Sequence, residues 1–168
     1  MAEHALQAAC FAQAAAAPPT LVIAALLHDI GHLVVDVPDD IGDWVDDAHH
    51  EEIGGNWLAR RFTADVFEPV RLHVPAKRYL CTTDAAYYSK LSPASVTTLK
   101  LQGGPMSAAE IEQFESERYW REAVRVRQWD DRGKVGGLVT PGLEAYRELI
   151  DGLTIATGLG GSPAHRTR

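Results

Sequence analysis

The sequence predicts an all-α fold, a helical bundle in one compact domain. Apolar residues recur every three or four positions along most of the chain and almost nowhere alternate with a period of two, which favours helices over strands. With 168 residues, of which 46% are hydrophobic, the chain is long enough to bury one core. We therefore expect a single domain over residues 1–155. The Gly, Ser and Pro content of residues 156–168 predicts a flexible C-terminal tail.

The first half of the chain is predicted to form four helices. Alanine dominates the first, and Pro18 and Pro19 end it and begin the second. In the fourth, Pro69 suits the first turn and Pro75 should kink the helix. The expected helices cover residues 3–16, about 20–34, 49–62 and 69–81, with a polar loop at 36–43.

Local start signals predict the helices of the second half. Ser92 and Pro93 suit the N-cap and first turn of a fifth helix. Ser107 and Glu110 have the spacing of a capping box at the start of a sixth. A seventh helix is expected over 119–131 and a last short one over 140–149.

Charge and cysteine content exclude several function classes. The net charge of −7 argues against nucleic-acid binding as the main function. No apolar run is long enough to span a bilayer, and residues 1–17 lack the pattern of a signal peptide. Cys10 and Cys81 match no zinc or disulfide framework. We expect a cytoplasmic protein that binds a small molecule rather than nucleic acid or membrane, and the oligomeric state stays open.

The motif His28-Asp29-Ile30-Gly31-His32 follows directly on the apolar run 21–27. A His-Asp pair at the end of such a run would be costly to bury without a partner. Imidazole and carboxylate are preferred ligands of iron, manganese and zinc, so a divalent metal is the expected partner. On a helix, His28 and His32 would share nearly the same face, with Asp29 about a quarter turn away.

The other histidines support a metal site. Six of the seven histidines precede residue 74, and each of the first four predicted helices supplies at least one. Asp130, late in the chain, could add a carboxylate. Bundles build two-metal sites from helices that each present such a residue inward. His49 and His165 are expected to be solvated. The residues that remain are His4, His28, His32, His50 and His73.

A second group of residues predicts an anion pocket beside the metal. Ser95, Thr98 and Gln102 share one face of the fifth predicted helix. Lys77 lies one helical turn after His73, and Arg127 lies nearly one turn before Asp130. Charge-assisted hydrogen bonds from such groups would hold an anion. A solvated polar stripe is the alternative.

Together, these motifs resemble the HD superfamily, which is named for its His…His-Asp…Asp ligands. The similarity extends over about residues 3–150 to the subgroup associated with phosphonate breakdown, which includes mixed-valence di-iron oxygenases that cleave carbon–phosphorus bonds. The stretches that carry it are Leu27-His-Asp-Ile-Gly-His32, His50-Glu-Glu-Ile-Gly54, Arg71-Leu-His-Val-Pro-Ala-Lys-Arg-Tyr-Leu-Cys81, Leu91-Ser-Pro-Ala-Ser95, Leu101-Gln-Gly-Gly-Pro-Met106 and Arg127-Gln-Trp-Asp-Asp131.

The resemblance implies a role for each candidate residue. One iron would be held by His4, His28 and Asp130, the other by His50 and His73, with Asp29 bridging the two. Substrate contacts would come from His32, Lys77, Ser95, Thr98, Gln102 and Arg127. In this scheme His28, Asp29 and His32 are catalytic, and His32 binds substrate rather than metal.

The resemblance also implies the reaction. Two iron ions in the Fe(II)/Fe(III) state, with O2 as co-substrate, would convert a 1-hydroxy-2-(amino or trimethylammonio)ethylphosphonate to phosphate and glycine or glycine betaine. Family members also carry a Tyr that caps one iron and a Glu that meets the substrate amine, both upstream of the position of His4. Two alternatives stay open, namely an HD-type phosphohydrolase acting on a nucleotide or other phosphate ester, and a non-catalytic metal-binding module.

Overall fold

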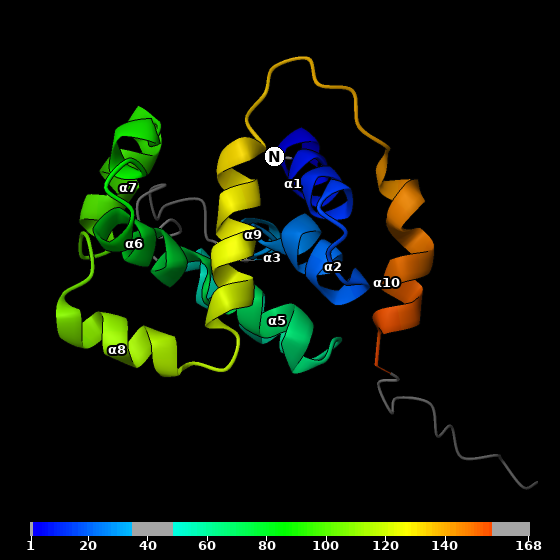
Figure 1. The fold of residues 1–168 in the computed structure, drawn as a ribbon. Helices are drawn as coiled ribbons and strands as arrows, with labels where there is room; N and C mark the ends of the chain where they lie inside the picture. The colour runs from blue at the N-terminus through cyan, green and yellow to red at the C-terminus, as the bar shows by residue number, and fades with distance from the viewer. Residues whose placement is uncertain (1, 35–48, 156–168) are drawn as a thin grey trace, which may run out of the picture.

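The computed structural model describes residues 2–34 and 49–155, and every regular element in this part of the chain is a helix (Figure 1). The prediction of an all-α fold in one compact domain is confirmed. The expected loop at 36–43 and the expected tail at 156–168 lie outside the described residues. The α-helices are α1 Ala2–Ala14, α2 Pro19–Leu27, α3 Gly31–Val34, α4 His50–Ala59, α5 Ala64–Arg71, α6 His73–Thr83, α7 Pro93–Leu101, α8 Ala108–Ser116, α9 Trp120–Arg132 and α10 Arg147–Leu153, and 3-10 turns are η2 Tyr88–Lys90 and η3 Leu143–Tyr146.

The main core surrounds α2, which is buried along residues 21–26. Small residues of α1 and branched residues of α5 and α9 pack against it. A smaller apolar cluster joins α6, α8 and α9. Helix α9 therefore belongs to both clusters, and in Figure 1 it stands between α1 and α2 on one side and α6 and α8 on the other. Residues from both sides of α9 can meet beside it.

The prediction of one continuous helix over about 20–34 is wrong. Helix α2 ends at Leu27, a turn follows over residues 28–30, and α3 begins at Gly31. Short-range bonds hold this turn, from the Ile30 N–H to the Leu27 carbonyl and from the His32 N–H to the Asp29 carbonyl. A Cβ at Gly31 would lie 1.9 Å from the backbone oxygen of His50, so α3 packs directly against the start of α4 there. His28 and His32 consequently do not share one helix.

The predicted helix 69–81 is two helices. Helix α5 ends at Arg71 and α6 begins at His73, with Leu72 between them. Pro69 lies inside α5 rather than in a first turn. Pro75 is the third residue of α6, where backbone N–H groups have no partner within the helix, so its missing donor produces no kink.

The local start signals of the second half are confirmed. Ser92 caps α7 by accepting a hydrogen bond from the Ser95 N–H, and Ser107 and Glu110 form a capping box at α8. Helices α4 and α9 lie within a few residues of the predicted 49–62 and 119–131. The last helix lies later than predicted, because residues 143–146 form a 3-10 turn before α10 begins at Arg147. None of the described helices is long and apolar enough to cross a membrane.

Candidate metal centre and anion pocket

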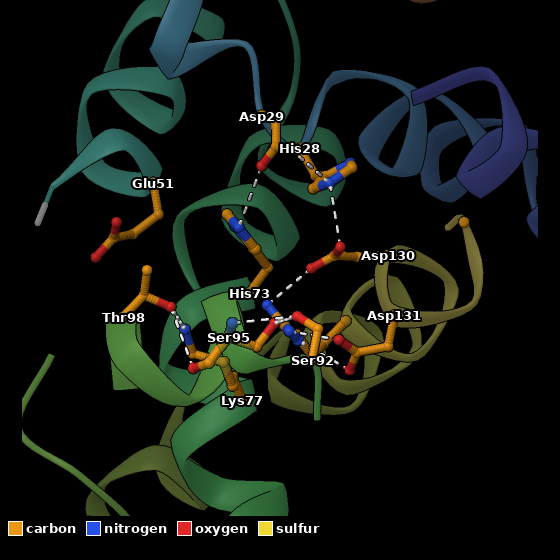
Figure 2. A network of polar contacts seen from close by, with 12 residues as sticks. His28, Asp29, Glu51, His73, Lys77, Ser92, Ser95, Thr98, Asp130 and Asp131 are labelled. Carbon is orange, nitrogen blue, oxygen red and sulfur yellow. Dashed lines mark hydrogen bonds and ion pairs between the residues drawn. The ribbon is translucent and has the colours of Figure 1, made fainter. Parts of the chain in front are cut away.

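The structure brings the six residues predicted as metal ligands to one place, although they come from five parts of the chain. They project from α1, the end of α2 and the turn after it, the starts of α4 and α6, and α9. Asp29 lies between two pairs of histidines. Figure 2 shows it beside one member of each pair, His28 and His73. Its Oδ2 is 3.3 Å from His28 Nε2 and 3.7 Å from His4 Nε2. Its Oδ1 is 3.8 Å from His50 Nε2 and 3.9 Å from His73 Nε2.

The first half of the centre is formed by His4, His28 and Asp130. His4 Nδ1 donates to the Gly133 carbonyl at 2.9 Å and His28 Nδ1 donates to the Ala25 carbonyl at 2.8 Å. Each neutral ring carries one proton, so both Nε2 atoms present lone pairs. These two atoms lie 3.1 Å apart, and Asp130 Oδ1 is 3.1 Å from His4 Nε2. Acceptors that converge in this way fit a shared cation.

The second half is formed by His50 and His73. His73 Nδ1 donates to the Val70 carbonyl at 2.7 Å, which leaves its Nε2 lone pair facing His50 Nε2 at 3.3 Å. The ring of His32 stacks on that of His50 with centroids 4.1 Å apart. His32 also offers a ring nitrogen within 4.8 Å of ligand atoms of Asp29 and His50. It therefore lies beside the second half as well as on the cavity described below.

The two halves differ in their electrostatics. Burial disfavours the protonated ring of His28, but Asp29 and Asp130 outweigh it and raise its pKa to about 9. Burial, reinforced by His50, lowers the pKa of His73 well below its usual range. A proton or a metal cation is therefore drawn to the first half, where two carboxylates meet, and a metal would displace the proton.

Glu51 is a buried carboxyl group beside the second half that the sequence did not single out. Its Oε2 is 3.7 Å from His50 Nδ1, on the side of the ring away from His73. Burial raises the pKa of Glu51 to about 7. Carboxylates in this position commonly orient metal-binding imidazoles.

A cavity of about 300 Å³ opens on this centre. Its volume suits a small polar molecule. Lys77 is buried, and its Nζ donates to Thr98 Oγ1 at 3.0 Å. In Figure 2, Lys77, Ser95 and Thr98 lie together below His73. All six predicted substrate contacts line the cavity, namely His32, Lys77, Ser95, Thr98, Gln102 and Arg127.

Arg127 lines the cavity but is also paired with carboxylates. Its Nη1 is 2.7 Å from Asp130 Oδ2, and its Nη2 is 2.5 Å from Asp131 Oδ1. Lys134 also lines the cavity and its Nζ lies 3.2 Å from Asp130 Oδ1. The sequence prediction missed Lys134, although it follows Asp130 by four residues, the same kind of spacing that pointed to Lys77. No local signal marks Tyr87, which contacts Arg127 from 40 residues away.

Comparisons with known proteins agree with this arrangement. Residues 1–98 match the model of the HD domain. The chain is 46% identical over 150 residues to a hydroxymethylphosphonate dioxygenase of Gimesia maris, which covers 89% of this chain and 75% of that protein. It is 43% identical to the glycine-betaine-forming 1-hydroxy-2-(trimethylamino)ethylphosphonate dioxygenase of Leisingera caerulea, over 89% of this chain and 76% of that protein. An uncharacterized protein of Acanthamoeba polyphaga mimivirus is 35% identical over 88% of the chain and 68% of its own length. The chain therefore belongs to the metal-binding HD-domain family, in the branch associated with phosphonate breakdown.

Proposed function

We propose that this protein is a di-iron, O2-dependent dioxygenase that cleaves the carbon–phosphorus bond of a small 1-hydroxyphosphonate. The observation that carries the proposal is Asp29, whose two oxygens face two histidine pairs at the end of a cavity lined by Lys77 and Arg127. The candidate metal ligands and the candidate anion-binding residues thus lie around one small cavity. The two named relatives act on phosphonates that carry a hydroxyl on the carbon next to phosphorus.

The donor set suits iron. It consists of imidazole nitrogens and carboxylate oxygens, which are the ligands of non-haem iron sites. In this proposal His4, His28 and Asp130 would hold one iron, His50 and His73 would hold the other, and Asp29 would contact both. The iron pair supplies one-electron chemistry and the capacity to react with O2. The backbone bonds at Nδ1 of His4, His28 and His73 keep the Nε2 atoms directed at the metals.

The cavity residues bind and orient the substrate. Lys77 and Arg127 neutralise the phosphonate, and the hydroxyl and amide groups of Ser95, Thr98 and Gln102 hydrogen-bond its oxygens. His32, stacked on His50, contacts the part of the substrate next to the metals. Together they hold carbon 1 in one position relative to the metal centre.

The overall reaction balances with O2 alone. A 1-hydroxyphosphonate and one O2 give a carboxylate and phosphate, the carbon–phosphorus bond breaks, and each product gains one oxygen atom. For a 2-amino or 2-trimethylammonio substrate the carboxylate is glycine or glycine betaine, and for hydroxymethylphosphonate it is formate.

The test is O2 consumption by the iron-loaded protein. We would reconstitute it anaerobically with Fe(II) and add hydroxymethylphosphonate or the 2-amino or 2-trimethylammonio 1-hydroxyethylphosphonate. One O2 taken up per phosphate released, with label from ¹⁸O2 in the phosphate, is the expected result. Zinc-loaded protein is the control, because zinc fills the site but has no redox chemistry. Release of phosphate from nucleotides without O2 uptake would instead establish the alternative, a phosphohydrolase in which the metals activate water.

A further inference from the structure

On the side away from Asp130, Arg127 is hydrogen-bonded by Tyr87 and Asp131, which do not line the cavity. Its Nε donates to the Tyr87 hydroxyl at 3.0 Å and to Asp131 Oδ2 at 3.1 Å, and its Nη2 donates to Asp131 Oδ1 at 2.5 Å. Tyr87 closes the ring by donating its own hydroxyl proton to Asp131 Oδ2. Figure 2 shows the side chains of Asp130 and Asp131 reaching from α9 into this network.

We propose that Tyr87 and Asp131 are positioning residues that fix the guanidinium of Arg127 between the metal ligand Asp130 and the anion pocket. One face of the network then orients a carboxylate for the metal, and the other orients a cation for the phosphonate. The role of Arg127 toward the phosphonate rests on the proposed function. Its role toward Asp130 concerns only the geometry of that carboxylate.

The donors of Arg127 divide between these tasks. A guanidinium has five N–H groups in a rigid fork. Tyr87 and Asp131 accept from Nε, Asp131 also accepts from Nη2, and Nη1 forms an ion pair with Asp130. One N–H on Nη1 and one on Nη2 are left for an anion in the cavity that Arg127 lines. The forked contact with Asp131 and the ion pair with Asp130 together determine the plane of the group as well as its place.

The network is buried enough for its charges to matter. Arg127 and Asp130 are about 95% buried, and Tyr87 is 8% exposed. Burial opposes the charge of Arg127, but Asp130 and Asp131 raise its pKa above the usual range. Burial, reinforced by Asp131, also raises the pKa of Tyr87, so its hydroxyl keeps the proton that it donates.

Tyr87 also connects two parts of the molecule. It lies in the segment between α6 and α7, 44 residues before Asp131 in the sequence. The hydrogen bonds from Tyr87 therefore tie α9, which carries Asp130, to the chain that leads into α7, which carries Ser95 and Thr98. A shift of Tyr87 would therefore move Asp130 and the residues of the anion pocket on α7 together.

The experiment uses Tyr87→Phe, which removes only the hydroxyl, and Asp131→Asn, which keeps the shape of the side chain but removes its charge. Tyr88→Phe, at an exposed neighbour, is the matched control. We would measure thermal unfolding, the dissociation constant for Fe(II), and the anaerobic affinity of the iron-loaded protein for the phosphonate, followed by kcat and KM. Asp131→Asn removes a charge-assisted contact with Arg127, so it should weaken phosphonate binding by about tenfold or more. Tyr87→Phe removes a neutral hydroxyl and should weaken binding by about three- to tenfold.

The control should match the wild type throughout. KM should rise more than kcat falls in Tyr87→Phe, and Asp131→Glu should recover part of the loss that Asp131→Asn causes. The iron affinity of the first half should fall in both Tyr87→Phe and Asp131→Asn. Unchanged iron and phosphonate affinities in a folded Tyr87→Phe protein would overturn the proposal, and so would equal loss in Asp131→Glu and Asp131→Asn. If the wild type binds iron but no phosphonate, the proposed function fails, and the iron affinities alone then decide the role of Tyr87 and Asp131.

Discussion

The two walls of the cavity are held in different ways. We call His4, Asp29, His50, His73 and Asp130, together with the buried His28 behind them, the metal wall, and Lys77, Ser95, Thr98 and Gln102 the anion wall. In the metal wall, three imidazoles donate from Nδ1 to backbone carbonyl groups. In the anion wall, Lys77 is held by the side chain of Thr98, and Thr98 and Gln102 are only partly buried.

This difference separates two properties of the site. Backbone groups at helix ends move only if the helices move, so the geometry of the metal wall is tied to the main core around α2. Side-chain contacts can change one residue at a time without disturbing a helix. We therefore expect substitutions in the metal wall to abolish the chemistry, and substitutions in the anion wall to change which phosphonate is bound and how tightly.

The strongest test of the metal wall is Asp29→Ala. Because each oxygen of Asp29 faces a different histidine pair, both irons should be lost and turnover should fall by about 10³-fold or more. Iron content per protein and O2 uptake would be measured. Asp151→Ala, an exposed aspartate on α10, is the control and should keep both irons. Retention of one iron in Asp29→Ala would contradict the bridging role.

The packing behind the metal wall is tested by Gly31→Ala. The new methyl group would lie 1.9 Å from the His50 backbone oxygen, so α3 and α4 must move apart. Overpacking of this kind costs about 1–3 kcal/mol of the free energy of unfolding and should loosen the second iron more than the first. Gly136→Ala is the control, since a Cβ there meets nothing within 4 Å. Denaturant unfolding and iron titration are the measurements, and a fully stable, fully loaded Gly31→Ala protein would refute the tight contact.

In the anion wall, Lys77→Met should raise KM and leave the irons in place. Methionine preserves the buried packing of the side chain but cannot form the charge-assisted bond, so KM for the phosphonate should rise by about 10- to 100-fold. Lys100→Met, at an exposed position on α7, provides the control. If Lys77→Met lost iron while KM stayed constant, the separation between the two walls would be wrong.

Features held by interactions within one helical turn could be predicted from the sequence, and features held by contacts between distant residues could not. The starts of α7 and α8 were predictable because Ser92 and the Ser107–Glu110 pair act within one helical turn. The break at residues 28–30 was not predictable, because it lies beside the close contact between Gly31 and His50, which only the folded chain makes.

The candidate site shows the same division. The spacing of Lys77 after His73 and of Arg127 before Asp130 placed both cations on the cavity that the structure contains. Tyr87 was missed because its contact with Asp131 spans 44 residues and leaves no periodic signal.

The smallest expected effect is that of Thr98→Val, which should change substrate binding by the anion wall without changing the metal wall. Thr98→Val keeps the size of the side chain but removes Oγ1, which accepts from Lys77 and in the proposed function also contacts the phosphonate, so both contacts are lost. Loss of this neutral hydroxyl should raise KM by about three- to tenfold and leave kcat and the iron content unchanged. Thr97→Val, on the same helix but exposed, should change nothing, because its hydroxyl bonds only the Pro93 carbonyl. Comparing kcat/KM for hydroxymethylphosphonate and the 2-trimethylammonio substrate in Thr98→Val then tells whether the anion wall selects between substrates. A uniform loss means that Lys77 and Thr98 recognise only the shared phosphonate, and an unequal loss means that they also determine where the rest of the substrate lies.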